Sequence, residues 1–167
     1  MTERDRLVNQ FEREIGGQPW HGPSLAAILE GITAEQAARR FSADTHSVWE
    51  ILLHMTGWKR EVIARARGRE AGEPEGGDWP AAGEVSEARW SAAQADHREA
   101  QRELLDLLRS LPEHQLEARV AGDTAASIGA GISVKATIYG LLQHDVYHAG
   151  QIALLKRLTG GTIRYGL

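Results

Sequence analysis

The sequence contains no cysteine and no long hydrophobic run. Without cysteine the chain cannot form a disulfide, a zinc–thiolate site or a cysteine nucleophile, so any bound metal ion would need histidine, carboxylate or water ligands. No stretch approaches the roughly 18 apolar residues of a membrane-spanning helix. The charged, amphipathic N-terminal segment lacks the apolar region of a signal peptide. We therefore expect a cytoplasmic protein with no membrane partner.

The sequence also lacks an excess of positive charge. Lysine and arginine total 19 against 23 aspartate and glutamate residues, for a formal net charge of −4. A nucleic-acid-binding protein usually shows a basic balance or stripe, so we expect no nucleic-acid partner. The length of 167 residues, with 42% hydrophobic and 25% charged residues, is typical of one globular domain spanning residues 1–167.

Apolar spacing and end signals predict four long helices, at about 2–15, 45–67, 86–111 and 133–160. A shorter helix is expected after Gly22, with Pro23 in its first turn. Thr45, Ser86 and Ser133 are the expected N-caps of the later three long helices. No segment alternates apolar and polar residues persistently, so no sheet is expected. Four amphipathic helices of similar length predict an all-α four-helix bundle.

Two segments are expected to be long loops. Residues 68–85 are rich in glycine, proline and charge, and residues 121–133 are rich in glycine and alanine. A loop as long as 68–85 is uncommon in a compact domain unless it covers a site or crosses the fold. We expect it to carry the chain along the bundle, and both loops to shape the specificity of any pocket.

The pair His144 and His148 is the sharpest chemical feature. Histidines four residues apart lie on one face of a helix and can converge on one metal ion. Seven randomly placed histidines would give roughly 0.3 such pairs. The pair alone therefore fits a metal site and two core or surface histidines without a metal about equally well. Gln151 extends the same stripe and is a candidate for orienting water or substrate. Burying these polar groups without partners would cost about 1–3 kcal/mol each, which a metal ion would offset.

A third ligand is needed, and His54 is the best candidate because it lies within the apolar run 51–55 of the second long helix. A lone histidine there is more often a core residue, but the His-x3-His pair favours a ligand. Three imidazoles leave coordination positions open for water or substrate, which is typical of catalytic sites. Zn or Ni suits this ligand set best, and Fe, Mn or Co also fits it.

Other residues near these positions allow more than one interpretation. Glu50, one turn before His54, is either a carboxylate that orients a ligand, a general base or an exposed helical glutamate. Asp145 and Tyr147 should point away from the ligand face, as structural residues or, for Tyr147, at a dimer contact. His21 could reach the site. Three tryptophans either line the pocket or, as we favour, pack in the core: Trp20, Trp49 and Trp58. Three further histidines are expected at the surface or at helix caps: His46, His97 and His114.

Two of these segments resemble the DinB/YfiT-like superfamily. GLLQHDVYHAGQIALLKRL (140–158) resembles its final-helix signature, and SVWEILLHMTGWKREVIARARG (47–68) resembles its second-helix motif. The stretch 20–40 and the GDWP of 77–80 are similar to one bacterial branch. The resemblance implies a four-helix bundle with a long crossover loop and a divalent metal ion on His54, His144 and His148 near one end. It also implies a homodimer.

The resemblance also implies a choice of activities. Family members include bacillithiol transferases and a mycothiol-dependent maleylpyruvate isomerase, and others are described as metal-dependent hydrolases. Our leading hypothesis is a metal-dependent transferase that uses a low-molecular-weight thiol on a small-molecule substrate. The second is a metal-dependent hydrolase, with Glu50 or Gln151 positioning the water. The third is a non-catalytic, stress-related module that binds a metal ion or another ligand.

Overall fold

The computed structural model describes residues 1–125 and 127–163, and their regular structure is helical. In chain order the elements are α1 (Glu3–Gly16), α2 (Leu25–Leu29), α3 (Ala34–Ala38), α4 (Val48–Ala66), α5 (Glu87–Ser110), the 3-10 helix η1 (Glu113–Glu117) and α6 (Val134–Leu158). Within the described ranges there is no strand, and an isolated bridge joins Arg119 to Ser133. The predicted all-α class is confirmed.

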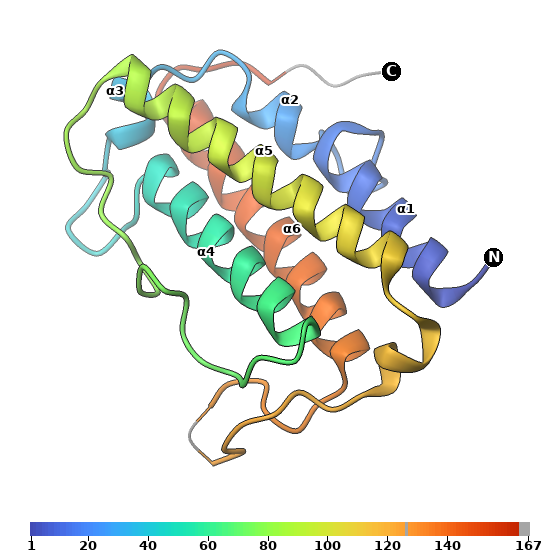
Figure 1. The fold of residues 1–167 in the computed structure, drawn as a ribbon. Coiled ribbons are helices and arrows are strands. Elements are labelled where there is room, and N and C mark those ends of the chain that lie inside the picture. The colour runs from blue at the N-terminus through green and yellow to red at the C-terminus, as the bar shows by residue number, and fades with distance from the viewer. Residues whose placement is uncertain (126, 164–167) are drawn as a thin grey trace.

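The four long helices α1, α5, α4 and α6 contact one another in that order around a bundle. In Figure 1, α4 and α5 run in the same direction, and α6 runs against both. Two consecutive helices that run the same way need a connection as long as the bundle, and residues 67–86 pass back along the outside of α4 to provide it (Figure 1). The predicted four-helix bundle with a long crossover loop is therefore confirmed.

Serine and threonine caps set where the helices begin. Ser86 and Ser133 cap α5 and α6 as predicted. The predicted start of α4 at Thr45 is wrong, because Ser47 is the N-cap and forms a reciprocal capping box with Glu50. The short helix α2 begins after the cap Ser24, so Pro23 precedes the helix instead of lying in its first turn. The short helix α3 was not predicted.

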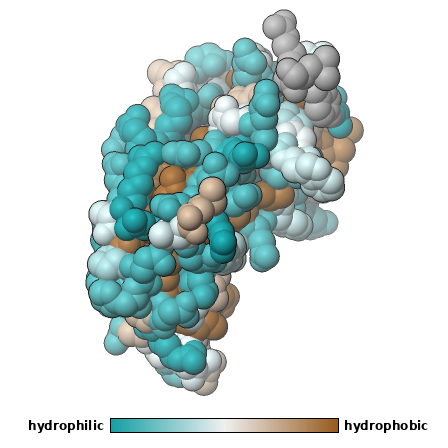
Figure 2. Space-filling view, turned by 90° about the vertical axis from the view of Figure 1, so that its right-hand side faces the viewer, coloured by the Kyte–Doolittle hydropathy of each residue, from teal (hydrophilic) through white to brown (hydrophobic). Residues whose placement is uncertain are grey.

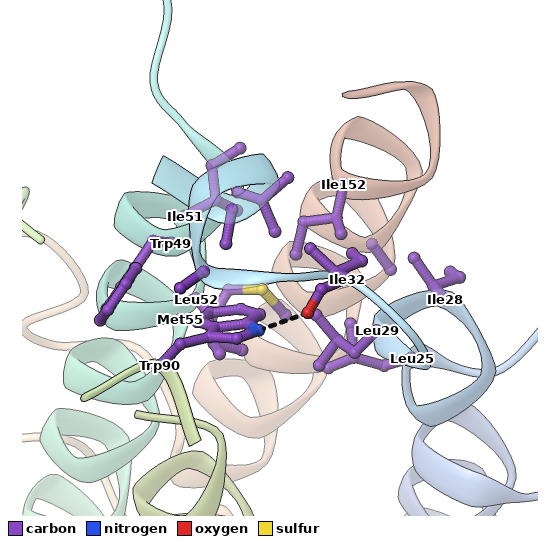
Figure 3. Packing of buried hydrophobic residues seen from close by; sticks show 14 residues of the cluster. Leu25, Ile28, Leu29, Ile32, Trp49, Ile51, Leu52, Met55, Trp90 and Ile152 are labelled. Carbon is purple, nitrogen blue, oxygen red and sulfur yellow. Dashed lines mark hydrogen bonds between the residues drawn. The ribbon is translucent and has the colours of Figure 1, made fainter. Parts of the chain in front are cut away.

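The hydrophobic core is divided into two clusters along the bundle. One lies at the end that carries α2 and α3, where the indole N–H of Trp90 donates a hydrogen bond of 2.7 Å to the carbonyl oxygen of Ile32 (Figure 3). Trp49 packs in the same cluster, with its ring 5.3 Å from that of Trp90. The second cluster contains Phe11 of α1 together with apolar residues of the later halves of α4 and α5 and the first half of α6.

Buried polar residues lie between the two apolar clusters along the long helices. On α6, for example, Asp145 follows Leu141 of one cluster and precedes Ala149 of the other. All four long helices contribute to this group, which we call the polar layer. Its members are all buried: Glu14, Thr56, Lys59, His97, Gln101 and Asp145.

The outer surface is mainly hydrophilic on the side that carries α1 and the N-terminus. Figure 2 shows this face, where hydrophobic side chains appear mostly in the gaps between hydrophilic ones. Among the helices of the described ranges, none is both long and apolar enough to cross a membrane.

Candidate metal centre

Three histidines from two antiparallel helices converge at one point. His54 comes from the first half of α4, and His144 and His148 come from successive turns of α6. One ring nitrogen from each lies within 4.8 Å of the others, and the Nε2 atoms of His54 and His144 are 2.8 Å apart. The structure thus brings together the three residues predicted as ligands, and they could hold a metal ion.

The Nδ1 atoms of His54 and His148 have oxygen partners, whereas that of His144 lies near a carboxylate oxygen without a hydrogen bond. His54 Nδ1 lies 2.6 Å from the carbonyl oxygen of Asp78, which can only accept, so Nδ1 donates and Nε2 keeps its lone pair. His148 Nδ1 similarly lies 2.7 Å from Gln151 Oε1. His144 Nδ1 is 3.7 Å from Asp145 Oδ1. Metal-binding histidines usually have such oxygen partners on the nitrogen that does not coordinate, so the donor set fits a divalent ion.

Burial keeps two of the three rings neutral. Desolvation lowers the pKa of His148 to about 4, although its hydrogen bond to Gln151 opposes the shift. Desolvation also lowers the pKa of His54, although its hydrogen bond to Asp78 opposes the shift. A metal ion binds the neutral form of imidazole, so these two rings are ready to act as ligands at neutral pH.

The crossover segment covers one side of the centre. The indole ring of Trp79 stacks between the rings of His54, at a centroid distance of 3.8 Å, and His46, at 3.6 Å. The neighbouring Asp78 accepts a hydrogen bond of 2.6 Å from Trp58 Nε1. Sequence reasoning did not select Trp79. The available signal was its place in GDWP, inside a loop that was expected to cover a site.

The histidines form part of the wall of a cavity of about 640 Å³. Trp58 and Trp79 line it on the side of α4 and the crossover segment, so the favoured core position of Trp58 is wrong. Tyr147 lines it on the side of α6 with Leu154 and Leu155, so the prediction that Tyr147 points away from the ligand face is also wrong. The expectation that residues 121–133 shape this pocket is wrong for the described part of that segment. It packs instead near the end of α4, where Arg65 Nη1 donates a hydrogen bond of 2.8 Å to the carbonyl oxygen of Ile128.

The two polar candidates beside the ligands have different positions. Gln151 lines the cavity and contacts His148, as its place on the α6 stripe suggested. Glu50 is bonded to Arg40 and Ser47 at the start of α4 and does not line the cavity. The hydrogen bond from Arg40, which outweighs the opposing effect of burial, lowers the pKa of Glu50 to about 2. Glu50 is therefore an anionic capping residue instead of a base at the site.

The remaining histidines and tryptophans divide between the core, the surface and the cavity. Trp49 is a core residue, as favoured, whereas Trp20 is fully exposed, so neither of its expected positions is correct. The prediction that His97 lies at the surface is wrong, because it is only 3% exposed. His21 lines a separate hollow beside Trp20 and does not reach the site, His114 is exposed, and His46 lines the cavity.

Comparisons with known proteins agree with this architecture. A family model described as the DinB superfamily matches residues 20–152. No curated protein matches the chain. A solved DinB-like protein from Bacillus cereus ATCC 10987 is similar in structure, with a TM-score of 0.62 over 98% of this chain and 91% of that chain. The two sequences are 15% identical, so this likeness shows a shared fold.

Proposed function

This chain belongs to the DinB superfamily, and from that premise we propose that it binds one divalent metal ion and transfers a low-molecular-weight thiol to an electrophilic small molecule. The observation that carries the proposal is the convergence of His54, His144 and His148 on the wall of a ligand-sized cavity. Three protein ligands leave at least one coordination position free, which is typical of catalytic metal sites.

The chain's own residues would hold the ion and shape the space beside it. A zinc or nickel ion bound there would act as a Lewis acid that lowers the pKa of a thiol or of water. The hydrogen bonds to Asp78 and Gln151 orient two of the imidazoles. Because the chain has no cysteine, a sulfur nucleophile has to come from a second small molecule.

The cavity walls favour an apolar, uncharged electrophile. Its volume of about 640 Å³ lies within the range of roughly 300–1,000 Å³ that is usual for small-molecule sites. Leu154, Leu155 and Ile51 supply apolar surface, and the rings of Trp58 and Trp79 supply aromatic surface. Among the described residues that line the cavity there is no lysine or arginine to pair with a carboxylate or phosphate group.

A hydrolase has less support from the side chains around the site. Glu50, one of the two residues expected to position a water molecule, is held by Arg40 and Ser47 instead. The side-chain oxygen of Gln151 is engaged by His148. Hydrolysis and simple metal binding are therefore the alternative outcomes of the experiments below.

The first experiment measures bound metal in protein purified without a histidine tag. We expect about one zinc or nickel ion per chain in the parent, and little in a variant with His144→Ala and His148→Ala. A matched control replaces two histidines outside the cavity, His21→Ala and His114→Ala, and should keep the metal content of the parent. If the parent takes up neither zinc nor nickel after reconstitution, the proposal is wrong.

The second experiment measures thiol transfer to monochlorobimane, which becomes fluorescent on reaction. A carbon–sulfur bond forms, the carbon–chlorine bond breaks, chloride leaves, and the thiol proton passes to solvent. With glutathione, bacillithiol or mycothiol as the donor, we expect the metal-loaded parent to accelerate the reaction of at least one thiol above the rate of the His144/His148 variant. Hydrolysis of esters or amides without thiol would instead favour the hydrolase. No activity in either assay would favour a non-catalytic binding module.

A further inference from the structure

His144 differs from the other two candidate ligands in its outward nitrogen. His54 and His148 each have a hydrogen-bond partner on Nδ1, whereas His144 Nδ1 is buried without one. The nearby Asp145 Oδ1 is also buried without a hydrogen-bond partner, and the two atoms are 3.7 Å apart. An unpartnered nitrogen and an unpartnered carboxylate oxygen thus lie next to each other at the edge of the site.

Asp145 is held by Lys59 of α4, which is itself bonded to α5. It is 0% exposed, and its Oδ2 accepts a hydrogen bond of 2.6 Å from Lys59 Nζ, which is itself 0% exposed. Lys59 Nζ also donates a hydrogen bond of 2.8 Å to Gln101 Oε1 on α5. The side chains of Asp145 and Lys59 form an ion pair inside the bundle. The ion pair engages Oδ2 and leaves Oδ1 for a second partner.

The chemistry of imidazole requires an acceptor at this position. A neutral imidazole that coordinates through Nε2 carries its proton on Nδ1. A buried N–H without an acceptor costs roughly 1–3 kcal/mol, so metal-binding histidines usually donate this proton to a carboxylate, a carbonyl group or water. Asp145 Oδ1 is a carboxylate oxygen near His144 Nδ1 and has no other hydrogen-bond partner. A small approach of the two groups would give a charge-assisted hydrogen bond.

We propose that Asp145, fixed by Lys59 and Gln101, is the positioning residue for His144 and accepts the hydrogen bond from its Nδ1 so that Nε2 points at the ion. This inference rests on the proposed function, because it concerns the ligand geometry of the metal-bound protein. By this inference, the buried ion pair of Lys59 and Asp145 in the polar layer sets the orientation of the His144 ring.

The test compares Asp145→Asn with a matched control, Glu61→Gln. Glu61 is another fully buried carboxylate, paired with Arg65 on α4, and it lies outside the cavity that the histidines line. Zinc affinity is measured in the untagged full chain by competition with a chromophoric chelator. We expect Asp145→Asn to weaken zinc binding about 10–100-fold, the usual effect of losing such a partner, and Glu61→Gln to change it little. An equal change in the two variants would show that Asp145 acts only on stability, and would overturn the inference.

A second measurement needs no variant, in case Asp145→Asn does not fold. In the zinc-loaded, ¹⁵N-labelled parent, the Nδ1 proton of His144 should resonate far downfield and exchange slowly with solvent. Exchange as fast as that of an exposed imidazole would overturn the inference. If the parent binds no zinc, the proposed function fails and the inference falls with it. If the parent binds zinc tightly and Asp145→Asn binds it equally well, the inference alone fails.

Discussion

At the scale of single residues, Trp79 connects the crossover segment to the candidate metal centre. Its indole ring lies parallel to that of His54, with an angle of 5° between the planes, and its other face stacks on His46. The His54 ring is also fixed at Nδ1 by the backbone of Asp78, the residue before Trp79. Two neighbouring residues of the loop therefore restrict the rotation of one candidate ligand.

This stacking gives an optical test of the site. A nickel ion bound at His54 should quench tryptophan fluorescence, and mainly that of Trp79, because its ring is 3.8 Å from the His54 ring whereas that of Trp58 is 6.4 Å away. We expect Trp79→Phe to remove most of the quenching in a Ni²⁺ titration. Trp20→Phe, which changes a fully exposed tryptophan, should leave it intact. Quenching of undiminished size in Trp79→Phe would place the nickel ion away from Trp79.

The roles of individual residues were predictable where local spacing determined them. The i, i+4 spacing of His144 and His148 fixes their common face, and the apolar surroundings of His54 turn it inward. Two readable signals were missed. Ser47 and Glu50 have capping-box spacing, which explains Glu50 without a role in chemistry. His97 is seven residues from both Trp90 and Leu104, which places it on the buried face of α5.

At the scale of elements, the crossover segment lies against α4 at a position without a side chain. A Cβ atom added at Gly57 would be 3.1 Å from the Cβ of Pro74, which is tighter than ordinary van der Waals contact. Glycine at this point lets the loop approach the helix closely, just before the loop reaches the site through Asp78 and Trp79.

This contact predicts different effects for two glycine-to-alanine substitutions in helices. Gly140→Ala on α6, where an added Cβ would meet no heavy atom within 4 Å, should raise the free energy of unfolding by about 0.5–1 kcal/mol, because alanine favours the helix more than glycine. Gly57→Ala should gain less or lose stability, because the new methyl group pushes on Pro74. Urea denaturation measures both, and an equal gain would contradict the close packing of loop and helix.

Helix ends were predictable only where a single cap was available. Ser86 and Ser133 each stand alone before an amphipathic segment, and both predictions are confirmed. Before α4, both Thr45 and Ser47 can cap, and the choice of Ser47 depends on Glu50 completing the box. The course of the crossover segment was less predictable, because contacts with α4, such as that of Pro74 with Gly57, determine it.

At the scale of the whole molecule, the order of apolar and polar layers arises from the packing of helices. The amphipathic pattern of four long helices and the family resemblance both predicted the bundle, and the helices of the structure confirm it. The polar layer could not be predicted in the same way. Lys59 and Asp145 are 86 residues apart, and nothing local to either predicts that their side chains will meet at 2.6 Å. From the sequence alone, Asp145 could be assigned only a general structural role.

The polar layer should make stability depend on pH in two opposite directions. Burial lowers the pKa of His97 to about 3, against an ordinary value of 6.5, so the unfolded chain takes up a proton before the folded chain does. This contribution to stability is present above pH 6.5 and is lost as the pH falls toward 3. Because Glu14 acts in the opposite direction over this range, the effect is measured against a variant: between pH 6 and pH 4.5, the unfolding free energy of the parent in urea should fall relative to that of His97→Gln. An unchanged difference between parent and variant would contradict this assignment.

Glu14 makes the stability of the protein depend on pH in the opposite direction. Burial, followed by repulsion from Asp145, raises the pKa of Glu14 to about 8 from an ordinary 4.5, so its contribution to stability is present below pH 4.5 and is lost as the pH rises toward 8. Each pKa unit corresponds to about 1.4 kcal/mol, so the parent should lose on the order of a few kcal/mol of unfolding free energy between pH 5.5 and 8.5.

The variant Glu14→Gln isolates this effect, because glutamine has the shape of the protonated acid and does not ionise. We expect its unfolding free energy, measured in urea, to fall much less between pH 5.5 and 8.5 than that of the parent. Glu12→Gln changes an exposed carboxylate of the same helix and should keep the slope of the parent. If Glu14→Gln also kept that slope, Glu14 would be ionised in the folded protein. The polar layer would then hold two carboxylates against the single cation of Lys59, a net charge that burial disfavours.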